Sequence, residues 1–343
     1  MKAVVVEQPG EISIRDIPES PLGPYDARCQ VLYGAVCTGT DLHLIDNRFP
    51  WPVSYPTVLG HESIGRVVGV GAQVRNFHIG DLVTRVGTLH VPDSELALHW
   101  GGFVEYAVAR DHWAMREDGL PPEAWCPFRI NQVVPAEIDP RVAPMLITWR
   151  ETFSYMTRMG VEAGATVLIL GSGGTGLSFT AHARNLHAGR VITIGSPARD
   201  ATARAAGATD YHNYTAHDLT SAVKNAIPDG VDFIIDSVGK QGQMDRMLPL
   251  LKPGGTVGVY GLDDWGAYHI DPSRARGTFT YYNNHYDEAE VHDAIVSFVL
   301  QGKLDATLWF DIEHPWPLHA ITDAFDALRE RKAVKALIQI AAP

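Results

Sequence analysis

The chain has 343 residues, which is more than a single hydrophobic core usually serves, so two domains are expected. Hydrophobic residues make up 45% and the formal net charge is −12, so neither nucleic acid nor a membrane surface is an expected partner. The three cysteines form no CxxC pair, which excludes a disulfide framework and a four-cysteine structural zinc site.

The first stretch, "MKAVVVEQPGEISI", has an apolar run that is broken at Glu7, so it predicts a strand rather than a signal peptide. No apolar run approaches the ~18 residues of a membrane span. Both observations favour a cytoplasmic protein.

Residues 1 to about 150 contain short β-type runs such as "KAVVVE", "ARCQVLYGAV" and "SIGRVVGVG", separated by Gly and Pro. This pattern predicts an all-β domain with glycine at its corners. Two stretches, 92–100 ("PDSELALHW") and 116–131, are expected to be surface excursions.

From about residue 151 the pattern changes to alternating strands and helices. Strands are expected at 166–171, 190–195, 231–239, 255–262 and 277–282. Strands that alternate with helices imply βαβ units and a parallel sheet. After residue 285, an amphipathic helix precedes a second helix and a terminal strand. The expected fold class is therefore α/β with two domains.

A glycine-rich loop directly follows the first of these strands and opens a helix. It fits the pattern G-x-G-x-x-G and consists of Gly171, Ser172, Gly173, Gly174, Thr175 and Gly176. The first glycine permits a tight turn, the second a close approach to a pyrophosphate, and the third close packing of helix and strand. The helix N-terminus then offers free N–H groups to the phosphates. The alternative is a glycine-rich turn without a ligand.

The end of the second strand, "GSPAR" (195–199), indicates which dinucleotide binds. NAD-binding domains usually carry a carboxylate there, about 20 residues beyond the loop. A small Gly195, the hydroxyl of Ser196 and the guanidinium of Arg199 suit a 2′-phosphate instead. We therefore expect NADP(H) rather than NAD(H); the alternative is that Arg199 is only a solvated helix residue.

Cys37 and His61 carry a thiol and an imidazole, which are ligands that zinc prefers. Glu62 supplies either a third ligand or a supporting anion. These three residues are the candidate ligands of a catalytic Zn²⁺. Alternatively, Cys37 is a small buried apolar residue, and His61 and Glu62 form a hydrogen-bonded structural pair.

A candidate proton relay lies next to these ligands. Thr40 would pass a proton from a substrate hydroxyl towards the cofactor ribose, and His43 would hand it to solvent. Asp41 is expected to accept the ring N–H of His61 and so to fix the tautomer of that ring. The candidate catalytic set is therefore Thr40, His43, Cys37 and His61.

With these residues and their surroundings, the chain resembles the medium-chain dehydrogenase/reductase superfamily, in its zinc-type alcohol and polyol dehydrogenase branch. The resemblance covers nearly the whole chain and includes "PTVLGHESIGRVVGVGAQVRNFHIGD", "GGFVEYAV", "GVEAGATVLILGSGGTG" and "LLKPGGTVGVYG". It implies a GroES-like, β-rich catalytic domain in 1–150 and 286–343, and a Rossmann domain with a doubly wound parallel sheet in 151–285. The Gly195-Ser196 pair resembles that of NADP-dependent secondary alcohol dehydrogenases.

The chain departs from the family in its metal site. The family loop reads Cys-x-Ser/Thr-Asp-x-His, but here one residue is extra, so aligning from the left selects Cys37 as the ligand and aligning from the right selects Thr38. The family's third-ligand position holds Ile147, which cannot bind zinc. Its neighbours Thr148 and Glu151 are expected to point elsewhere. The family's structural zinc lobe is absent, and residues 88–100 take its place.

The expected activity is the NADP(H)-dependent interconversion of a small-molecule alcohol and a carbonyl by hydride transfer, with zinc assistance if Cys37, His61 and Glu62 hold the ion. The first alternative is a metal-independent NADPH reductase of an activated double bond or carbonyl. The second is a non-catalytic dinucleotide-binding protein.

Two further expectations concern the substrate and the assembly. Trp51, Trp149 and the Trp113–Trp125 segment would suit a bulky or aromatic substrate if they line the cleft, although such residues more often pack in a core. The family implies a homodimer or homotetramer, paired through 255–264 or 277–284 as edge strands.

Overall fold

The computed structural model describes residues 1–91 and 94–341. The chain divides into two compact units, one formed by Met1–Arg150 with Glu288–Pro343 and the other by Glu151–Asp287. Helix α4 (Met145–Met159) crosses from the first unit into the second. Within the described ranges, no helix is long and apolar enough to cross a membrane.

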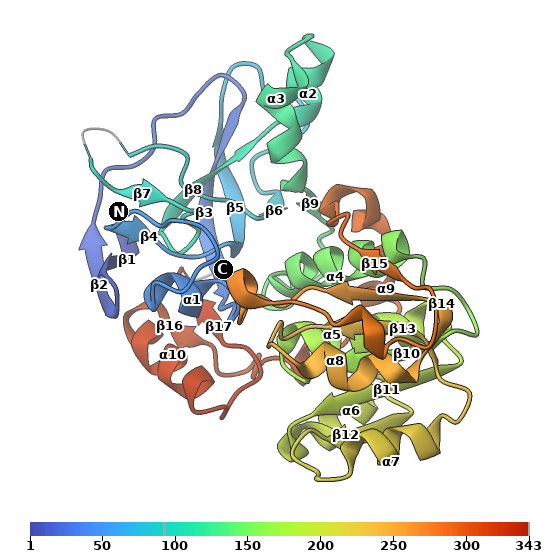
Figure 1. Cartoon of the computed structure of the whole chain (residues 1–343). Helices are drawn as coiled ribbons and strands as arrows, with labels where there is room; N and C mark the ends of the chain where they lie inside the picture. The colour runs from blue at the N-terminus through green and yellow to red at the C-terminus, as the bar shows by residue number, and fades with distance from the viewer. Residues whose placement is uncertain (92–93, 342–343) are drawn as a thin grey trace. The chain divides into compact units, whose positions relative to one another are not determined.

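Two sheets build the first unit (Figure 1). One has the order β2-β1-β4-β7, and the other has the order β16-β17-β3-β5-β6-β9, with β8 paired to β3. The strands are β1 (Lys2–Gln8), β2 (Glu11–Asp16), β3 (Asp26–Ala35), β4 (Thr57–Val58), β5 (Glu62–Val70), β6 (Leu82–Thr84), β7 (Ala97–Leu98), β8 (Tyr106–Arg110), β9 (Val133–Val134), β16 (Trp316–Pro317) and β17 (Leu337–Gln339). The β-rich, GroES-like domain expected for this part of the chain is confirmed, although short helices lie between its strands.

The first unit also contains short helical segments. They are α1 (Asp41–Ile45), α2 (His112–Glu117), α3 (Pro122–Trp125), η1 (Cys126–Ile130), η6 (Glu288–Val291), α9 (His292–Leu300), η7 (Ala306–Leu308), η8 (Leu318–Ala320) and α10 (Ile321–Arg329). Helices α1 and α10 bury Leu44, Ile45 and Phe325 in one core with Val36 and Phe103. That core anchors both ends of the segment that carries the candidate metal and relay residues.

Gly60 shapes the chain just before β5. Its φ is +95°, and a Cβ atom there would collide with the backbone nitrogen and ring of Phe103. Only glycine adopts such a backbone conformation at little cost. Phe103 is fully buried, and its N–H donates to the carbonyl of Leu59. The close contact with Phe103 therefore fixes the direction in which His61 and Glu62 leave the turn.

The second unit contains a single six-stranded parallel sheet in the order β12-β11-β10-β13-β14-β15. Its strands are β10 (Thr166–Leu170), β11 (Arg190–Gly195), β12 (Asp210–Asn213), β13 (Val231–Asp236), β14 (Leu251–Val259) and β15 (Thr280–Tyr282). If β10 to β15 are numbered 1 to 6, the strand order across the sheet is 3-2-1-4-5-6. This is the order of a doubly wound dinucleotide-binding fold. The expected Rossmann architecture is confirmed.

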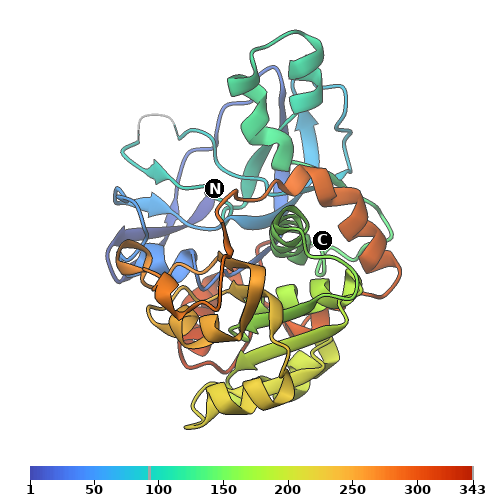
Figure 2. The ribbon, with the colours of Figure 1, turned by 45° about the vertical axis from the view of Figure 1, so that its right-hand side comes forward.

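Helices cover the sheet of the second unit, as Figures 1 and 2 show. Helix α5 packs on β10 and β11, α6 and α7 on β12, and α8 on β13. The central strand reads "TVLIL" and is buried along most of its length, as expected for a parallel strand covered on both faces. The helical segments are α5 (Gly174–Asn185), η2 (Pro197–Arg199), α6 (Asp200–Ala206), α7 (Leu219–Ala226), α8 (Gln243–Met247), η3 (Leu248–Leu250), η4 (Trp265–Ala267) and η5 (Pro272–Arg274).

One expectation about the sheet edges is wrong. Strand β14 pairs with β13 on one side and β15 on the other, so 255–264 does not form a sheet edge, whereas β15 does. In the segment 92–100, which was expected to be a surface excursion, Ala97 and Leu98 form β7 and pair with β4, and none of its described residues is buried. Residues 92–93 of that segment lie outside the described residues.

Candidate active site

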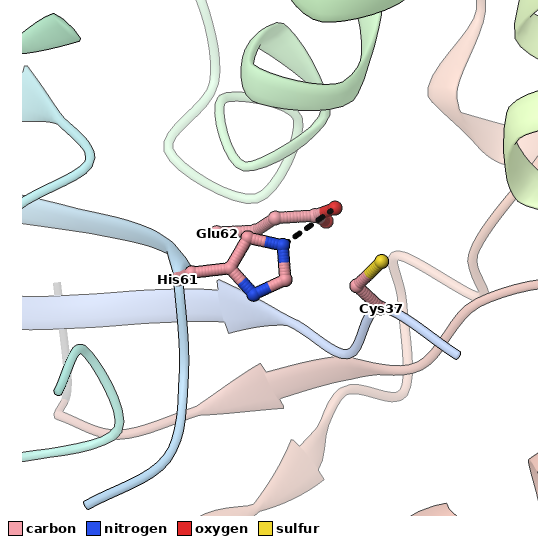
Figure 3. Close-up of side chains that lie close together, drawn as sticks. All are labelled: Cys37, His61 and Glu62. Carbon is pink, nitrogen blue, oxygen red and sulfur yellow. Dashed lines mark ion pairs between the residues drawn. The ribbon is translucent and has the colours of Figure 1, made fainter. Parts of the chain in front are cut away.

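Cys37, His61 and Glu62 come together because strands β3 and β5 are antiparallel neighbours. Their register pairs Ala35 with Glu62, so the residue two positions beyond the end of β3 lies beside the start of β5. One ligand atom from each of the three side chains lies within 4.8 Å of the other two. Figure 3 shows the three side chains converging, with His61 Nε2 3.8 Å from Glu62 Oε1.

Anionic groups surround the ring of His61, which is buried. Its Nδ1 lies 3.6 Å from Oδ1 of Asp41, and Oδ2 of Asp41 accepts the backbone N–H of Cys37. Burial by itself would lower the pKa of His61, but Asp41 and Cys37 outweigh burial and raise that pKa to about 10. Asp41 thus faces Nδ1 of His61 as an ion-pair partner, but at 3.6 Å the two atoms are farther apart than in the hydrogen bond that was expected. The site as a whole stabilises a positive charge.

The extra residue of the loop is taken up in the turn Thr38–Thr40. The backbone N–H groups of Thr40 and Asp41 both donate to the carbonyl of Cys37, at 3.3 and 2.8 Å. Thr38 is exposed, whereas Cys37 is half-buried and lies beside His61. Cys37 is therefore the loop residue whose side chain meets the other candidate ligands.

The two candidate relay residues lie at the start of α1. Thr40 is half-buried at the N-cap position, and no cap hydrogen bond ties up its hydroxyl. His43 lies three residues further along and is 4% exposed. The expectation that His43 meets solvent is therefore wrong for this conformation, and any proton leaving through its ring needs a further acceptor.

Ile147, at the position where the family places a third zinc ligand, is fully buried in α4. Its neighbour Thr148 does not point elsewhere, contrary to expectation, because its hydroxyl donates to Oε1 of Glu62 at 2.8 Å. Glu151 does point elsewhere, and its carboxylate accepts the hydroxyls of Tyr260 and Tyr286.

Sequence reasoning missed Lys335. Its ammonium group donates to Oε2 of Glu62 and to the hydroxyl of Thr148, the latter at 2.9 Å, and its side chain is buried. A signal for it exists in the sequence, since Lys335 is the one charged residue in the apolar run "AVKALIQI". A charge in a buried run usually has a partner of opposite charge.

A zinc ion fits the three donors that are present. A thiolate, an imidazole and a carboxylate make a catalytic-type set, and ligand atoms on one tetrahedral ion are separated by roughly 3.5 Å, close to the spacing observed. Both oxygens of Glu62 already accept hydrogen bonds, but each carboxylate oxygen can accept more than one interaction. Lys335 nevertheless brings a competing positive charge.

The glycine-rich loop has the geometry expected of a dinucleotide site. Gly171 follows β10 with a φ of +110°, and a Cβ atom there would collide with Ser237. A Cβ atom on Gly176 would collide with the carbonyl of Gly171, so the third glycine allows α5 to approach the strand. Around Gly173 the space is open, which leaves the N-terminus of α5 accessible to a phosphate. Gly174 and Thr175 begin the helix, and both are half-buried.

Gly195 is the last residue of β11, and neighbouring side chains occupy the position that a side chain at 195 would take. A Cβ atom there would collide with the side chain of Ser172 and with the hydroxyl of Tyr211. The Tyr211 hydroxyl donates to the carbonyl of Ser196, and Oγ of Ser172 accepts the backbone N–H of Ser196 at 3.1 Å. Tyr211 was not anticipated, and the sequence holds no signal for it. These contacts leave no room for a carboxylate at position 195.

Arg199 lies at the end of the short helix that follows Ser196. Its side chain is half-buried, and burial lowers the pKa of its guanidinium from the usual value, with Tyr211 acting in the opposite direction. Ser196 and Arg199 therefore lie within one turn of the strand end, as their spacing predicts.

Comparison with known proteins identifies both units. A model of the alcohol dehydrogenase GroES-like domain matches residues 23–121, and a model of the zinc-binding dehydrogenases matches residues 174–290. The chain is 31% identical to the NADP-dependent isopropanol dehydrogenase of Thermoanaerobacter brockii over 271 residues, which are 75% of this chain and 74% of that protein. It is 25% identical to the L-galactonate-5-dehydrogenase of Escherichia coli (strain K12) over 342 residues, 98% of each chain. The crystal structure of benzyl alcohol dehydrogenase from Acinetobacter calcoaceticus has a TM-score of 0.81 at 20% identity, over 99% of each chain.

Proposed function

The chain belongs to the medium-chain dehydrogenase/reductase superfamily, in its zinc-type alcohol and polyol dehydrogenase branch, and on this premise we propose that it interconverts an alcohol and a carbonyl by hydride transfer with NADP(H). It is an oxidoreductase, and its substrate is a small molecule. The observation that carries the proposal is the convergence of Cys37, His61 and Glu62 beside the turn that holds Thr40.

Cys37, His61 and Glu62 would hold the zinc ion of this family. When bound, zinc polarises the substrate oxygen and lowers the pKa of an alcohol, which makes loss of the alcohol proton feasible near neutral pH. The surrounding residues suit this role, because Asp41 lies on the Nδ1 side of His61, and Nε2, on the side of Glu62, is the ring nitrogen that would bind the ion.

Thr40 and His43 would move the proton. The Thr40 hydroxyl, which has no capping bond to satisfy, would accept the proton of the substrate hydroxyl and pass its own onward. His43, one helical turn away in α1, would receive it through the cofactor ribose. Because His43 is buried, a further acceptor would have to take the proton from its ring to solvent.

Three features support NADP(H) over NAD(H). The space at Gly195 is filled by Ser172 and Tyr211, so no acidic side chain can bind a ribose diol from that position. Ser196 and Arg199 offer a hydroxyl and a cation to a 2′-phosphate. The isopropanol dehydrogenase at 31% identity is named as NADP-dependent. Gly171, Ser172, Gly173, Gly174, Thr175 and Gly176 would bind the pyrophosphate.

A metal-independent NADPH reductase is the second candidate, and the pair of Lys335 and Glu62 favours it. A carboxylate that already has a buried cation as partner gains less from a metal ion than one without a partner. In that case Thr40 or His61 would donate a hydrogen bond to the carbonyl that is reduced.

One experiment tests the proposal and separates the candidates. The purified chain is mixed with NADP⁺ or NAD⁺ and a set of secondary alcohols, and the formation of the reduced cofactor is followed by absorbance. Turnover with a marked preference for NADP⁺, in protein that carries about one zinc per chain, supports the first candidate. Reduction of carbonyls by NADPH in metal-free protein supports the second. Failure to bind NADPH would contradict both.

A further inference from the structure

An aromatic cluster lies against the candidate metal ligand His61. The ring of Trp100 packs on the imidazole of His61, with centroids 5.3 Å apart. Phe49 meets Trp100 edge to face at 6.3 Å, and Trp51 meets Phe49 in the same manner at 4.4 Å. All four residues belong to the first unit. The cluster therefore extends outward from the site where a substrate oxygen would bind.

The two tryptophans of this cluster keep much of their surface exposed, 49% for Trp51 and 36% for Trp100. Two large apolar side chains that share one patch and remain open usually mark a binding surface rather than a core. Trp149, by contrast, is fully buried against Trp309 and belongs to the core, which is the alternative given for it above.

Trp100 is held in a backbone conformation that bulky residues rarely adopt, with a φ of +77°. The neighbouring backbone enforces it. The carbonyl of Trp100 accepts the N–H of Thr88 at 3.1 Å, and a Cβ atom on Gly87 would collide with that same carbonyl. Strain of this kind persists where the surroundings dictate it, and it concentrates at ligand-binding positions. Here the strained residue directs its ring towards His61.

We propose that Phe49, Trp51 and Trp100 form the apolar wall of the substrate site, so that the enzyme acts on alcohols and ketones whose carbinol carbon bears a ring or a branched apolar group. This inference rests on the proposed function. A substrate whose oxygen lies at Cys37, His61 and Glu62 has its carbon substituents one or two bonds away, next to the ring of Trp100. An apolar substituent gains from burial there, whereas a hydroxyl loses its hydration against the ring face.

The oxidation of the alcohol needs no reactant besides the oxidised cofactor. In the direction of oxidation, the carbinol C–H bond breaks and its electron pair passes with the hydrogen to the nicotinamide ring. The O–H proton leaves by way of Thr40, and the C–O bond becomes a carbonyl. The wall takes no part in these steps. It positions the carbon that loses hydride, so Phe49, Trp51 and Trp100 are specificity residues rather than catalytic ones.

The test compares four alcohols with NADP⁺: 1-phenylethanol, cyclohexanol, propan-2-ol and glycerol. We expect kcat/KM to be highest for the two ring-bearing alcohols and lowest for glycerol. W100A should lower kcat/KM for 1-phenylethanol by roughly 10- to 200-fold, the range for lost apolar pocket contacts, while changing the value for propan-2-ol less than about threefold. W265A is the matched control, since Trp265 is 50% exposed in the second unit and should leave all four values unchanged.

A binding measurement complements the kinetics. Isothermal titration of acetophenone into the complex with NADP⁺ should show weaker binding to W100A than to the wild type. W51A provides the same comparison if W100A fails to fold, because Trp51 is exposed and has no unusual backbone conformation.

The outcomes separate the two proposals. A preference for glycerol, or an equal loss for 1-phenylethanol and propan-2-ol in W100A and W51A, would overturn the aromatic wall and leave the dehydrogenase proposal standing. Absence of turnover with all four alcohols and their carbonyl products would overturn the proposed function, and the wall's role with it.

Discussion

The ammonium group of Lys335 and the carboxylate of Glu62 form a buried ion pair at the candidate metal site. Thr148 completes the arrangement, because its hydroxyl donates to Glu62 and accepts from Lys335. Lys335 lies where β17 approaches β3, and Glu62 begins β5 on the other side of β3. The polypeptide thus already places one positive charge, that of Lys335, against the carboxylate that would bind zinc. This charge affects the stability of the site without zinc and its affinity for the ion.

Replacing Lys335 by methionine should destabilise the metal-free protein. The change keeps an unbranched side chain one atom shorter but leaves the buried Glu62 without its cation, which typically costs about 3–5 kcal/mol. Urea unfolding in the presence of a chelator measures the effect. Zinc should restore more stability to K335M than to the wild type, because the ion then supplies the missing positive charge.

K332M is the control for this substitution. Lys332 lies on the same segment but is 72% exposed, and its partner Glu330 is also exposed. A change in unfolding free energy beyond about 0.5 kcal/mol in K332M, or none in K335M, would contradict the role assigned to the buried pair.

Removal of either Cys37 or His61 should abolish zinc binding. Elemental analysis of purified protein is expected to find about one zinc per chain in the wild type and close to none in C37S and H61A. C126S is the matched cysteine control, because Cys126 is exposed and far from the cluster in sequence. Zinc retained in C37S would show that Thr38, or another residue of the turn, is the ligand instead.

Thr40→Ala should lower kcat by roughly 10²- to 10⁴-fold, the usual contribution of a positioned proton-transfer group. Thr40→Ser keeps the hydroxyl and should restore most of the activity. Because Thr40 makes no capping hydrogen bond, neither substitution should change the melting temperature much. Equal activity of T40A and T40S across the pH profile would remove Thr40 from the relay.

Arg199→Ala should raise KM for NADPH by about 10- to 100-fold and leave KM for NADH unchanged, since a hydrogen bond to a charged group contributes roughly 1.5–3 kcal/mol. R204A is the control, because Arg204 follows on α6 and pairs with Asp200 at the surface. Parallel changes for both cofactors in R199A would mean that the guanidinium does not contact a 2′-phosphate.

Stability should fall as the pH drops from about 6.5 to about 4, in part because of His292. Burial is the main cause that lowers the pKa of His292 to about 4, and the neighbouring guanidinium of Arg150 is the second. Its Nε2 faces the carbonyl of Val133 and its Nδ1 faces Arg150, an arrangement that fits the neutral ring with its proton on Nε2. The pKa of His292 is about 4 in the folded protein and about 6.5 in the unfolded chain. Between these two values the unfolded chain binds a proton that the folded chain does not, so a fall in pH through this range lowers the free energy of unfolding.

The loss attributable to His292 is on the order of 3 kcal/mol between pH 7 and pH 4. Urea unfolding over that range measures it. H292Q keeps a donor for Val133 but cannot titrate, so its stability should depend less steeply on pH than that of the wild type. H314Q, at an exposed histidine, should keep the wild-type slope. An unchanged slope in H292Q would contradict the assignment.

Local pattern in the sequence determined the two-domain organisation and the cofactor loop. The strand "TVLIL", the glycines at 171, 173 and 176 and the helix that follows are contiguous in sequence. Gly171 and Gly176 are required by close contacts, and Gly173 leaves open space for a phosphate. Cys37, His61 and Glu62 were also selected from residue type and spacing, because zinc accepts few kinds of ligand. Such inferences need no knowledge of distant parts of the chain.

Only the tertiary structure decided what surrounds these residues. Glu62 and Lys335 are separated by 273 positions, and no periodicity links them. The choice between Cys37 and Thr38 depended on how one extra residue fits into a turn between packed elements, and the filled space at Gly195 depended on Tyr211 from the next strand. Contacts between strands that are remote in sequence set the charge and the free volume of a site, and sequence spacing carries no record of them.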